Sequence, residues 1–229
     1  FVITLVGRDH SVWMKAVNMK EEAVMGNLSG EVVKVTAAES NLGNYEQARA
    51  DFKWEDIEKT FSWYETGKVN MAYEAIDRHA ESGRKNKVAL YYSDDKRDEK
   101  YTFGEMKRKS NQFANVLKKL GITKGERMFI FMPRSPELYF SLLGALKAGV
   151  IVGPLFEAFM ETAVRDRLQD SEATAIITTP ALLPRVPASE LPALKHIILV
   201  GHDLELAEGQ VDFHKEMAEA SDKYDIVWL

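Results

Sequence analysis

Cysteine is absent from this chain of 229 residues, which excludes disulfides, thiolate zinc sites and a cysteine nucleophile. The chain also lacks any run of the roughly 18 to 20 apolar residues that a membrane-spanning helix needs. Neither charge sign dominates, because 30 Lys and Arg stand against 35 Asp and Glu. Neither nucleic acid nor a membrane surface is therefore an expected partner. A chain without cysteine fits a reducing compartment, so the cytoplasm is the expected location.

Histidine is sparse, and its distribution argues against a metal site. No histidine has a histidine or carboxylate partner at metal-ligand spacing. The central glycines do not form a dinucleotide-binding fingerprint either, because Gly144 and Gly149 lie within or just after a helical pattern rather than before one. Neither a metal nor a nicotinamide cofactor is expected. The five histidines are His10, His79, His196, His202 and His214.

Three regions differ in their patterns. Residues 1–38 show no sustained period after a short apolar start, so we interpret them as an extension such as a tag or upstream sequence. Residues 39–100 predict a helical N-terminal cap followed by a hairpin, with aromatic residues such as Trp54 and Trp63 supplying buried surface. Residues 101–229 alternate between helical and apolar-strand patterns.

The alternating region predicts the fold class. Thr102 stands three residues before Glu105, as in a capping box, and Pro136 and Gly149 bracket the next helix. Helix, strand, helix at this spacing predicts an α/β fold with a parallel sheet covered by helices on both faces. The strands are expected at residues 127–132, 150–156, 173–179, 196–201 and 225–229.

Two turns follow predicted buried strands. They are "FMPRSPE" at residues 131–137 and "GPLFEAF" at residues 153–159. Ligands of open α/β sheets bind at the carboxyl ends of the strands. These two turns are therefore the expected location of a ligand site.

Two longer motifs include or flank these turns and carry a resemblance. The first is "YTFGEMKRKSNQFANVLKKLG" and the second is "LLGALKAGVIVGPLFEAF", with "FMPRSPELYF" between them. Through these motifs, residues 44–229 resemble the adenylate-forming acyl-CoA synthetases, within them the AMP-forming acetyl-CoA synthetase type of Bacillus-like bacteria. Met106 stands at the family's usual Leu. Residues 101–229 would then be the N-terminal subdomain of the AMP-binding domain, and residues 1–38 lie outside the resemblance.

The resemblance implies a reaction in two steps for a complete enzyme. A small carboxylic acid, with acetate favoured, would react with ATP to give an acyl-adenylate and pyrophosphate. The CoA thiol would then take the acyl group and release AMP. ATP, Mg²⁺ and CoA are thus the implied cofactors, and the site must stabilise developing charge and exclude water.

The chain departs from the family at the phosphate loop. It contains no Gly/Ser/Thr-rich loop of the kind that relatives carry, so we expect a truncated N-terminal fragment with no catalytic residue and no activity alone. The exposed edge of a truncated sheet would allow self-association. The alternative is a stand-alone, non-catalytic module that binds a nucleotide, CoA or a protein partner.

The remaining site expectations concern the CoA side. The resemblance places the CoA nucleotide near the turn after the second predicted strand, although Glu157 and Ala158 stand where longer acetate enzymes have glycines. Arginine suits phosphate because its guanidinium group presents a fork of donors. Arg165 and the nearby Arg167 could instead form a solvated helix face. The CoA-side candidates are Arg185, Arg134, Arg165, Phe156, Glu157 and Ala158.

Overall fold

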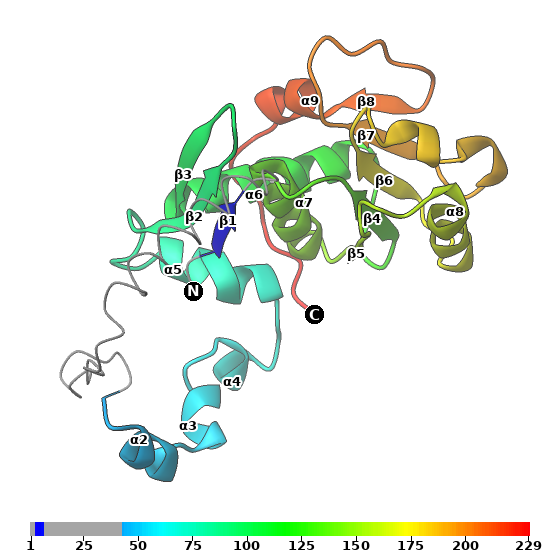
Figure 1. Cartoon of the computed structure of the whole chain (residues 1–229). Helices are drawn as coiled ribbons and strands as arrows, with labels where there is room; N and C mark the ends of the chain where they lie inside the picture. The colour runs from blue at the N-terminus through cyan, green and yellow to red at the C-terminus, as the bar shows by residue number, and fades with distance from the viewer. Residues whose placement is uncertain (1–2, 7–42) are drawn as a thin grey trace, which may run out of the picture. The chain divides into compact units, whose positions relative to one another are not determined.

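The computed structural model describes residues 3–6 and 43–229. Contacts divide the chain into two units, one of Phe1–Leu5 with Lys68–Leu229 and one of Val6–Gly67. In the second unit the described helices are α2 (Tyr45–Asp51), α3 (Trp54–Glu58) and α4 (Trp63–Thr66) (Figure 1). The first unit holds the sheets and the candidate site. Apart from Ile3–Val6, the predicted extension at residues 1–38 lies outside the described residues.

The helices α2 to α4 contain no buried residue. Phe52 packs edge-on against Trp54, and Phe61 stacks on Trp63 with ring centroids 4.1 Å apart. The expected burial of Trp54 is not observed, since its side chain is 68% exposed. Helices of four to seven residues are too short to enclose aromatic rings of this size.

A small sheet begins the first unit. Its strands are β1 (Ile3–Val6), β2 (Val88–Ser93) and β3 (Asp98–Thr102), in the order β1-β2-β3. β2 and β3 pair antiparallel, as the predicted hairpin requires. The helical segment before them comprises a π-helix, η2 (Tyr73–Asp77), and α5 (Arg78–Ala80). Asn70 caps this segment, because its Oδ1 accepts hydrogen bonds from the backbone N–H groups of Ala72 and Tyr73.

The larger sheet has five strands in the order β5-β4-β6-β7-β8, and every neighbouring pair is parallel. The predicted parallel sheet is therefore confirmed. The carboxyl ends of all five strands lie at one edge, where ligands bind in this class of fold. The strands are β4 (Arg127–Phe131), β5 (Ile151–Pro154), β6 (Ala175–Thr178), β7 (His196–Leu199) and β8 (Gln210–Asp212).

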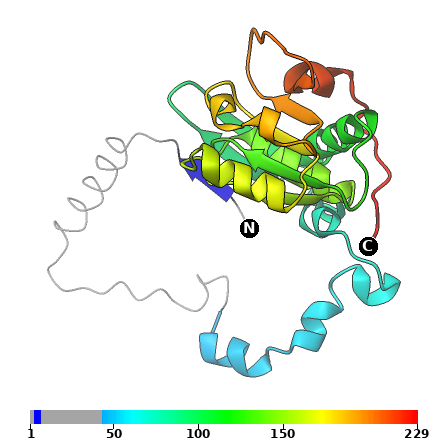
Figure 2. The same ribbon diagram turned by 90° about the vertical axis from the view of Figure 1, so that its right-hand side faces the viewer.

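Helices cover both faces of this sheet (Figure 2). Along β4, Met128 and Ile130 pack with α6, α7 and α9, whereas Phe131 packs with α8 on the other face. Side chains alternate between faces along a strand, so one strand serves two cores. The helices are α6 (Phe103–Lys119), α7 (Pro136–Lys147), α8 (Glu161–Asp170) and α9 (Phe213–Glu219), with 3₁₀ turns η3 (Leu183–Arg185) and η4 (Ala188–Glu190).

The ends of α6 and its contact with α7 follow from single residues. The Thr102 hydroxyl accepts from the Glu105 N–H while the Glu105 carboxylate accepts from the Thr102 N–H, which confirms the predicted capping box. Gly144 lets the two helices approach closely, because a Cβ there would lie 2.7 Å from the Ser110 carbonyl oxygen. The backbones of α6 and α7 are therefore held in one close register.

Two strand predictions need correction. The segment at residues 150–156 was expected to be buried, yet β5 occupies the edge of the described sheet and Ile151 is 59% exposed. Pro154 fits an edge because a proline cannot donate to a neighbouring strand. Residues 225–229 do not join the sheet. Leu229 and Val69 instead exchange two backbone hydrogen bonds of 3.0 Å, beside the C-terminal end of α7.

Candidate functional site

The turn after β5 is the centre of the candidate site. β5 delivers residues 155–160 to the carboxyl edge of the sheet, and α8 begins directly afterwards at Glu161. The N–H of Phe159 donates to the Phe156 carbonyl at 2.9 Å and closes the turn. The two rings meet edge to face, with centroids 5.9 Å apart, and Phe156 is 63% exposed. The turn thus presents an aromatic face to solvent.

Arg185 forms hydrogen bonds to the backbone of this turn. Its Nη1 donates to the carbonyl oxygens of Glu157 at 3.0 Å and Phe159 at 3.3 Å. Arg167 approaches from α8, with its guanidinium carbon 4.3 Å from the centre of the Phe159 ring. The structure thereby brings together four predicted residues, Phe156, Glu157, Ala158 and Arg185, and places Phe159 and Arg167 beside them.

Within the turn, the side chain of Ala158 is exposed. The two other predicted arginines are arranged differently. Arg165 forms ion pairs with Asp166 at 3.2 Å and Glu190 at 3.4 Å, so its charge is already partnered. Arg134 lies exposed between β4 and α7, and within the described residues no hydrogen bond, ion pair or ring contact joins it to the turn. Arg134 lies two residues before the start of α7, and its positive charge opposes the rise that desolvation causes in the pKa of Tyr139.

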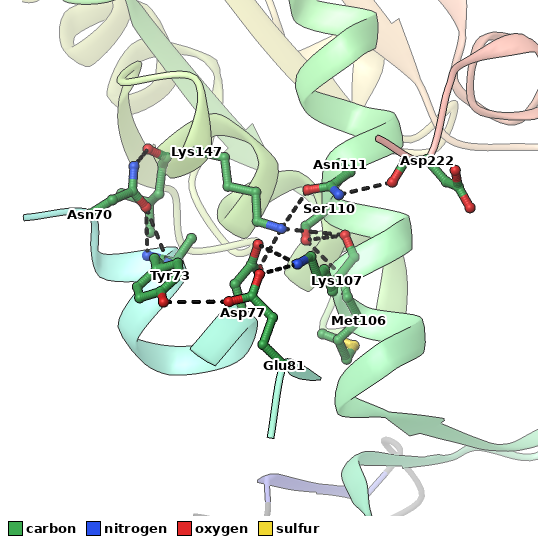
Figure 3. Close-up of polar contacts among 12 residues, drawn as sticks. Asn70, Tyr73, Asp77, Glu81, Met106, Lys107, Ser110, Asn111, Lys147 and Asp222 are labelled. Carbon is green, nitrogen blue, oxygen red and sulfur yellow. Dashed lines mark hydrogen bonds and ion pairs between the residues drawn. The ribbon is translucent and has the colours of Figure 1, made fainter. Parts of the chain in front are cut away.

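The structure contains a buried polar cluster that the sequence analysis did not predict. Lys147 is fully buried, and its Nζ lies 2.7 Å from Asp77 Oδ1 and 2.7 Å from Asn111 Oδ1 (Figure 3). Desolvation lowers the pKa of Lys147 and raises that of Asp77, and the attraction between them opposes both shifts. The available signal was Lys147 itself, a charge at the end of a helix that is otherwise apolar after Glu137.

A second ion pair fixes the start of α7. Arg97 of the β2–β3 turn donates from Nη1 and Nη2 to the two carboxylate oxygens of Glu137, at 3.1 and 3.2 Å. Burial alone would raise the pKa of Glu137, but the hydrogen bonds from Arg97, from Ser135 and from its own backbone N–H, together with the charge of Arg97, leave the pKa below its usual value. This bidentate contact ties the hairpin to the helix that follows the first carboxyl-edge turn.

The described residues contain no group of three or more His, Asp or Glu that could hold a metal ion. Within the same residues, none of the helices has the length and apolar character needed to cross a membrane. The site is thus an aromatic turn with arginines around it, without metal ligands or a carboxylate pair. Such a surface can bind an anionic group or a flat ring.

Comparison with known proteins identifies the family. Residues 76–227 match the model described as AMP-binding enzyme. The chain belongs to this family. It is 58% identical to the acetyl-coenzyme A synthetase of Bacillus subtilis (strain 168) over 190 residues, which are 82% of the chain and 33% of that relative. It is 33% identical to the corresponding enzyme of Methanothrix soehngenii over 74% of the chain and 28% of that relative.

The solved structures agree with the family assignment. The Brucella canis acyl-CoA synthetase superposes with a TM-score of 0.71 and 28% identity, over 81% of this chain and 34% of that one. The predicted α/β class is thereby confirmed. The chain spans a third or less of the length of the curated relatives above. Residues 43–67, the described part of the second unit of this chain, precede the residues that the family model matches.

Proposed function

We propose that the protein to which this chain belongs is an AMP-forming acetate–CoA ligase. The observation that carries the proposal is the 58% identity to a Bacillus subtilis protein named acetyl-coenzyme A synthetase, over 82% of the chain. The second curated relative bears the same name. Acetate is therefore the proposed acid, and a compartment that supplies ATP and CoA, the cytoplasm, is the proposed location.

The proposed chemistry has two balanced steps. A carboxylate oxygen attacks the α-phosphorus of ATP, the bond to the β-phosphate oxygen breaks, and pyrophosphate leaves. The CoA thiol then loses its proton and attacks the acyl carbon of the adenylate. The C–O bond to AMP breaks, and the thioester and AMP are released.

This chain is proposed to contribute to the CoA side. Arg185 donates from Nη1 to the carbonyls of Glu157 and Phe159, while its Nε and Nη2 make no hydrogen bond within the described part of the chain. Those donors are oriented by the tethered Nη1 and suit a phosphate oxygen. The exposed ring of Phe156 suits the flat base of a nucleotide. Glu157 and Ala158 would then contact the ligand through the backbone of the turn.

The two other arginines have weaker support. Arg134 is exposed at the neighbouring carboxyl-edge turn, just before α7. Arg165 would first have to leave Asp166 and Glu190. The described residues contain no group of three or more His, Asp or Glu that could hold Mg²⁺. We propose no catalytic residue in this chain, which spans a third or less of its curated relatives.

The test compares two proteins, the product of the complete reading frame and the chain of residues 1–229. Each is incubated with ATP, Mg²⁺, acetate and CoA, and AMP formation is measured after the intact mass has been determined. We expect AMP only from a product heavier than 25.9 kDa. AMP from residues 1–229 alone would contradict the absence of catalytic residues. A native product of 25.9 kDa that forms no AMP would favour a non-catalytic binding module.

The CoA side is tested in the active product by Arg185→Ala. We expect the KM for CoA to rise about tenfold, as for a lost charged hydrogen bond, with ATP–pyrophosphate exchange unchanged. Arg127→Ala is the matched control, because Arg127 lies at the opposite edge of the sheet and bonds the Ser171 carbonyl. An unchanged KM for CoA in Arg185→Ala would exclude this arginine from the CoA site.

A further inference from the structure

The segment after α9 is irregular, and hydrogen bonds fix both of its ends. Residues 221–229, which we name the strap, form neither helix nor strand and run along α6 to the end of α7. None of its residues is buried. The strap nevertheless has a defined path, because it is bonded at both of its ends.

At its start, the strap is bonded by side-chain amides of α6. Asn115 donates from Nδ2 to the carbonyl oxygens of Ser221 and Lys223, both at 2.8 Å. Asn111 donates from Nδ2 to the Asp222 carbonyl at 2.9 Å. Two carboxamides on consecutive turns of one helix thus hold three successive carbonyls. Recognition through carbonyl groups does not depend on the side chains of the strap.

At its end, the strap is bonded by backbone and by Asn70. Val227 donates its N–H to the Lys147 carbonyl at 2.9 Å, and its own carbonyl accepts from Asn70 Nδ2 at 3.0 Å. Gly149 provides the space, since a Cβ there would lie 3.0 Å from Val227 Cγ1. The ring of Trp228 lies 5.0 Å from that of Tyr73.

The buried cluster sets the direction of one of these amides. Lys147 has only donors, so Asn111 must turn Oδ1 toward it, as Figure 3 shows. Its Nδ2 then points at the Asp222 carbonyl. Asp77 in turn holds the Lys147 ammonium at 2.7 Å. A chain of polar contacts therefore runs from the π-helix through α7 and α6 to the strap.

We propose that Asn111 and Asn115 are positioning residues for the proposed ligase reaction, acting by clamping the main chain of the strap. Any polypeptide that continues past Leu229 starts from the place and direction that the strap imposes. The Bacillus subtilis relative is about three times as long as the part that this chain matches. Its remaining part must therefore be oriented in space relative to this unit. The inference rests on the proposed function for its catalytic consequence, whereas the clamp itself can be tested without activity.

The experiment uses the product of the complete reading frame and the variant Asn115→Asp. The new carboxylate has nearly the same shape but cannot donate to the two carbonyls. We expect hydrogen exchange in a peptide of residues 221–229 to accelerate at least about tenfold, because two hydrogen bonds are lost. We also expect kcat of acetate-dependent ATP–pyrophosphate exchange to fall, with the KM for acetate unchanged.

Two further variants separate positioning from folding. Asp222→Ala is the matched control, because it removes a strap side chain and leaves the Asp222 carbonyl that Asn111 binds. We expect this variant to have the same hydrogen exchange in the strap and the same kcat of ATP–pyrophosphate exchange as the wild type. Asn115→Gln keeps a carboxamide and should restore part of both properties. The proposal is supported if the variant with the fastest hydrogen exchange in the strap also has the lowest kcat, and the ranking of the three variants is the same for both measurements.

Three results would overturn it in distinguishable ways. Unchanged strap exchange in Asn115→Asp would refute the clamp. Faster strap exchange with unaltered kcat would refute the positioning role and leave only a structural clamp. A wild-type product without acetate-dependent exchange would refute the proposed function, while the hydrogen-exchange comparison would still decide the clamp.

Discussion

The buried ion pair between Lys147 and Asp77 allows a quantitative prediction. Their side chains are 0% and 2% exposed, with Nζ and Oδ1 2.7 Å apart. We consider Lys147→Met, Asp77→Asn and the double variant. Lys147→Met keeps the volume of the side chain but leaves Asp77 charged, and it removes the donor to Asn111 Oδ1.

The magnitude follows from two opposing terms. At 2.7 Å and an effective dielectric constant of about 20, the attraction is about 6 kcal/mol. Desolvation of two ions costs several kcal/mol each, so the intact pair adds little net stability. Removing one partner costs about 3 to 5 kcal/mol. We expect the lower end for Lys147→Met, because Lys107 Nζ remains 3.9 Å from Asp77.

The assay is urea unfolding followed by far-UV circular dichroism for the wild type, both single variants and the double variant. We expect the double variant to lose less free energy of unfolding than the sum of the singles, by about 2 kcal/mol. Lys118→Met, at an exposed position on α6, is the control and should change little. Single effects that add within about 0.5 kcal/mol would show that the two charges do not stabilise each other.

Two further predictions concern α7. Gly144→Ala should destabilise the protein by about 1 to 3 kcal/mol, because its Cβ would lie 2.7 Å from the Ser110 oxygen. Gly83→Ala is the control, because a Cβ added there would have no other atom within 4 Å. Equal melting temperatures of the Gly144→Ala and Gly83→Ala variants would contradict the predicted clash. Glu137 has a lowered folded-state pKa, so its pairing with Arg97 stabilises above the unfolded pKa of about 4.3 and is lost as pH falls through the folded value. Glu137→Gln should therefore be less stable than the wild type at pH 7 and approach it below about pH 4, and a pH-independent difference in urea midpoints would contradict this assignment.

Several features of the fold could be predicted because their signals are local. The capping box from Thr102 to Glu105 and the position of Pro136 at the start of α7 depend on residues within one helical turn. The alternation of helix and strand then leaves a parallel sheet as the expected arrangement. The position of β5 at the edge was not predictable, because an apolar run of four to seven residues does not reveal which neighbours it will have.

In the candidate site, too, some features have a local signal in the sequence and others depend on tertiary contacts. The turn that contains Phe156 and Glu157 was predicted as a ligand site from its place after an apolar strand, and the resemblance then implied CoA as its ligand. The contact of Arg185 with the Glu157 carbonyl spans 28 residues and depends on where η3 lies beside the turn. The pairing of Arg165 with Glu190 spans 25 residues and likewise has no local signal.

The sequence by itself determined the class of fold, the ends of its main helices and, through its motifs, the family. These properties depend on periodicity, on capping residues and on short patterns that neighbouring residues form together. Only the tertiary structure decided the strand order, the burial of Lys147 beside Asp77, and the path of the strap along Asn111 and Asn115. Each of these joins residues far apart in the chain, and such contacts exist only once helices and sheet have packed together.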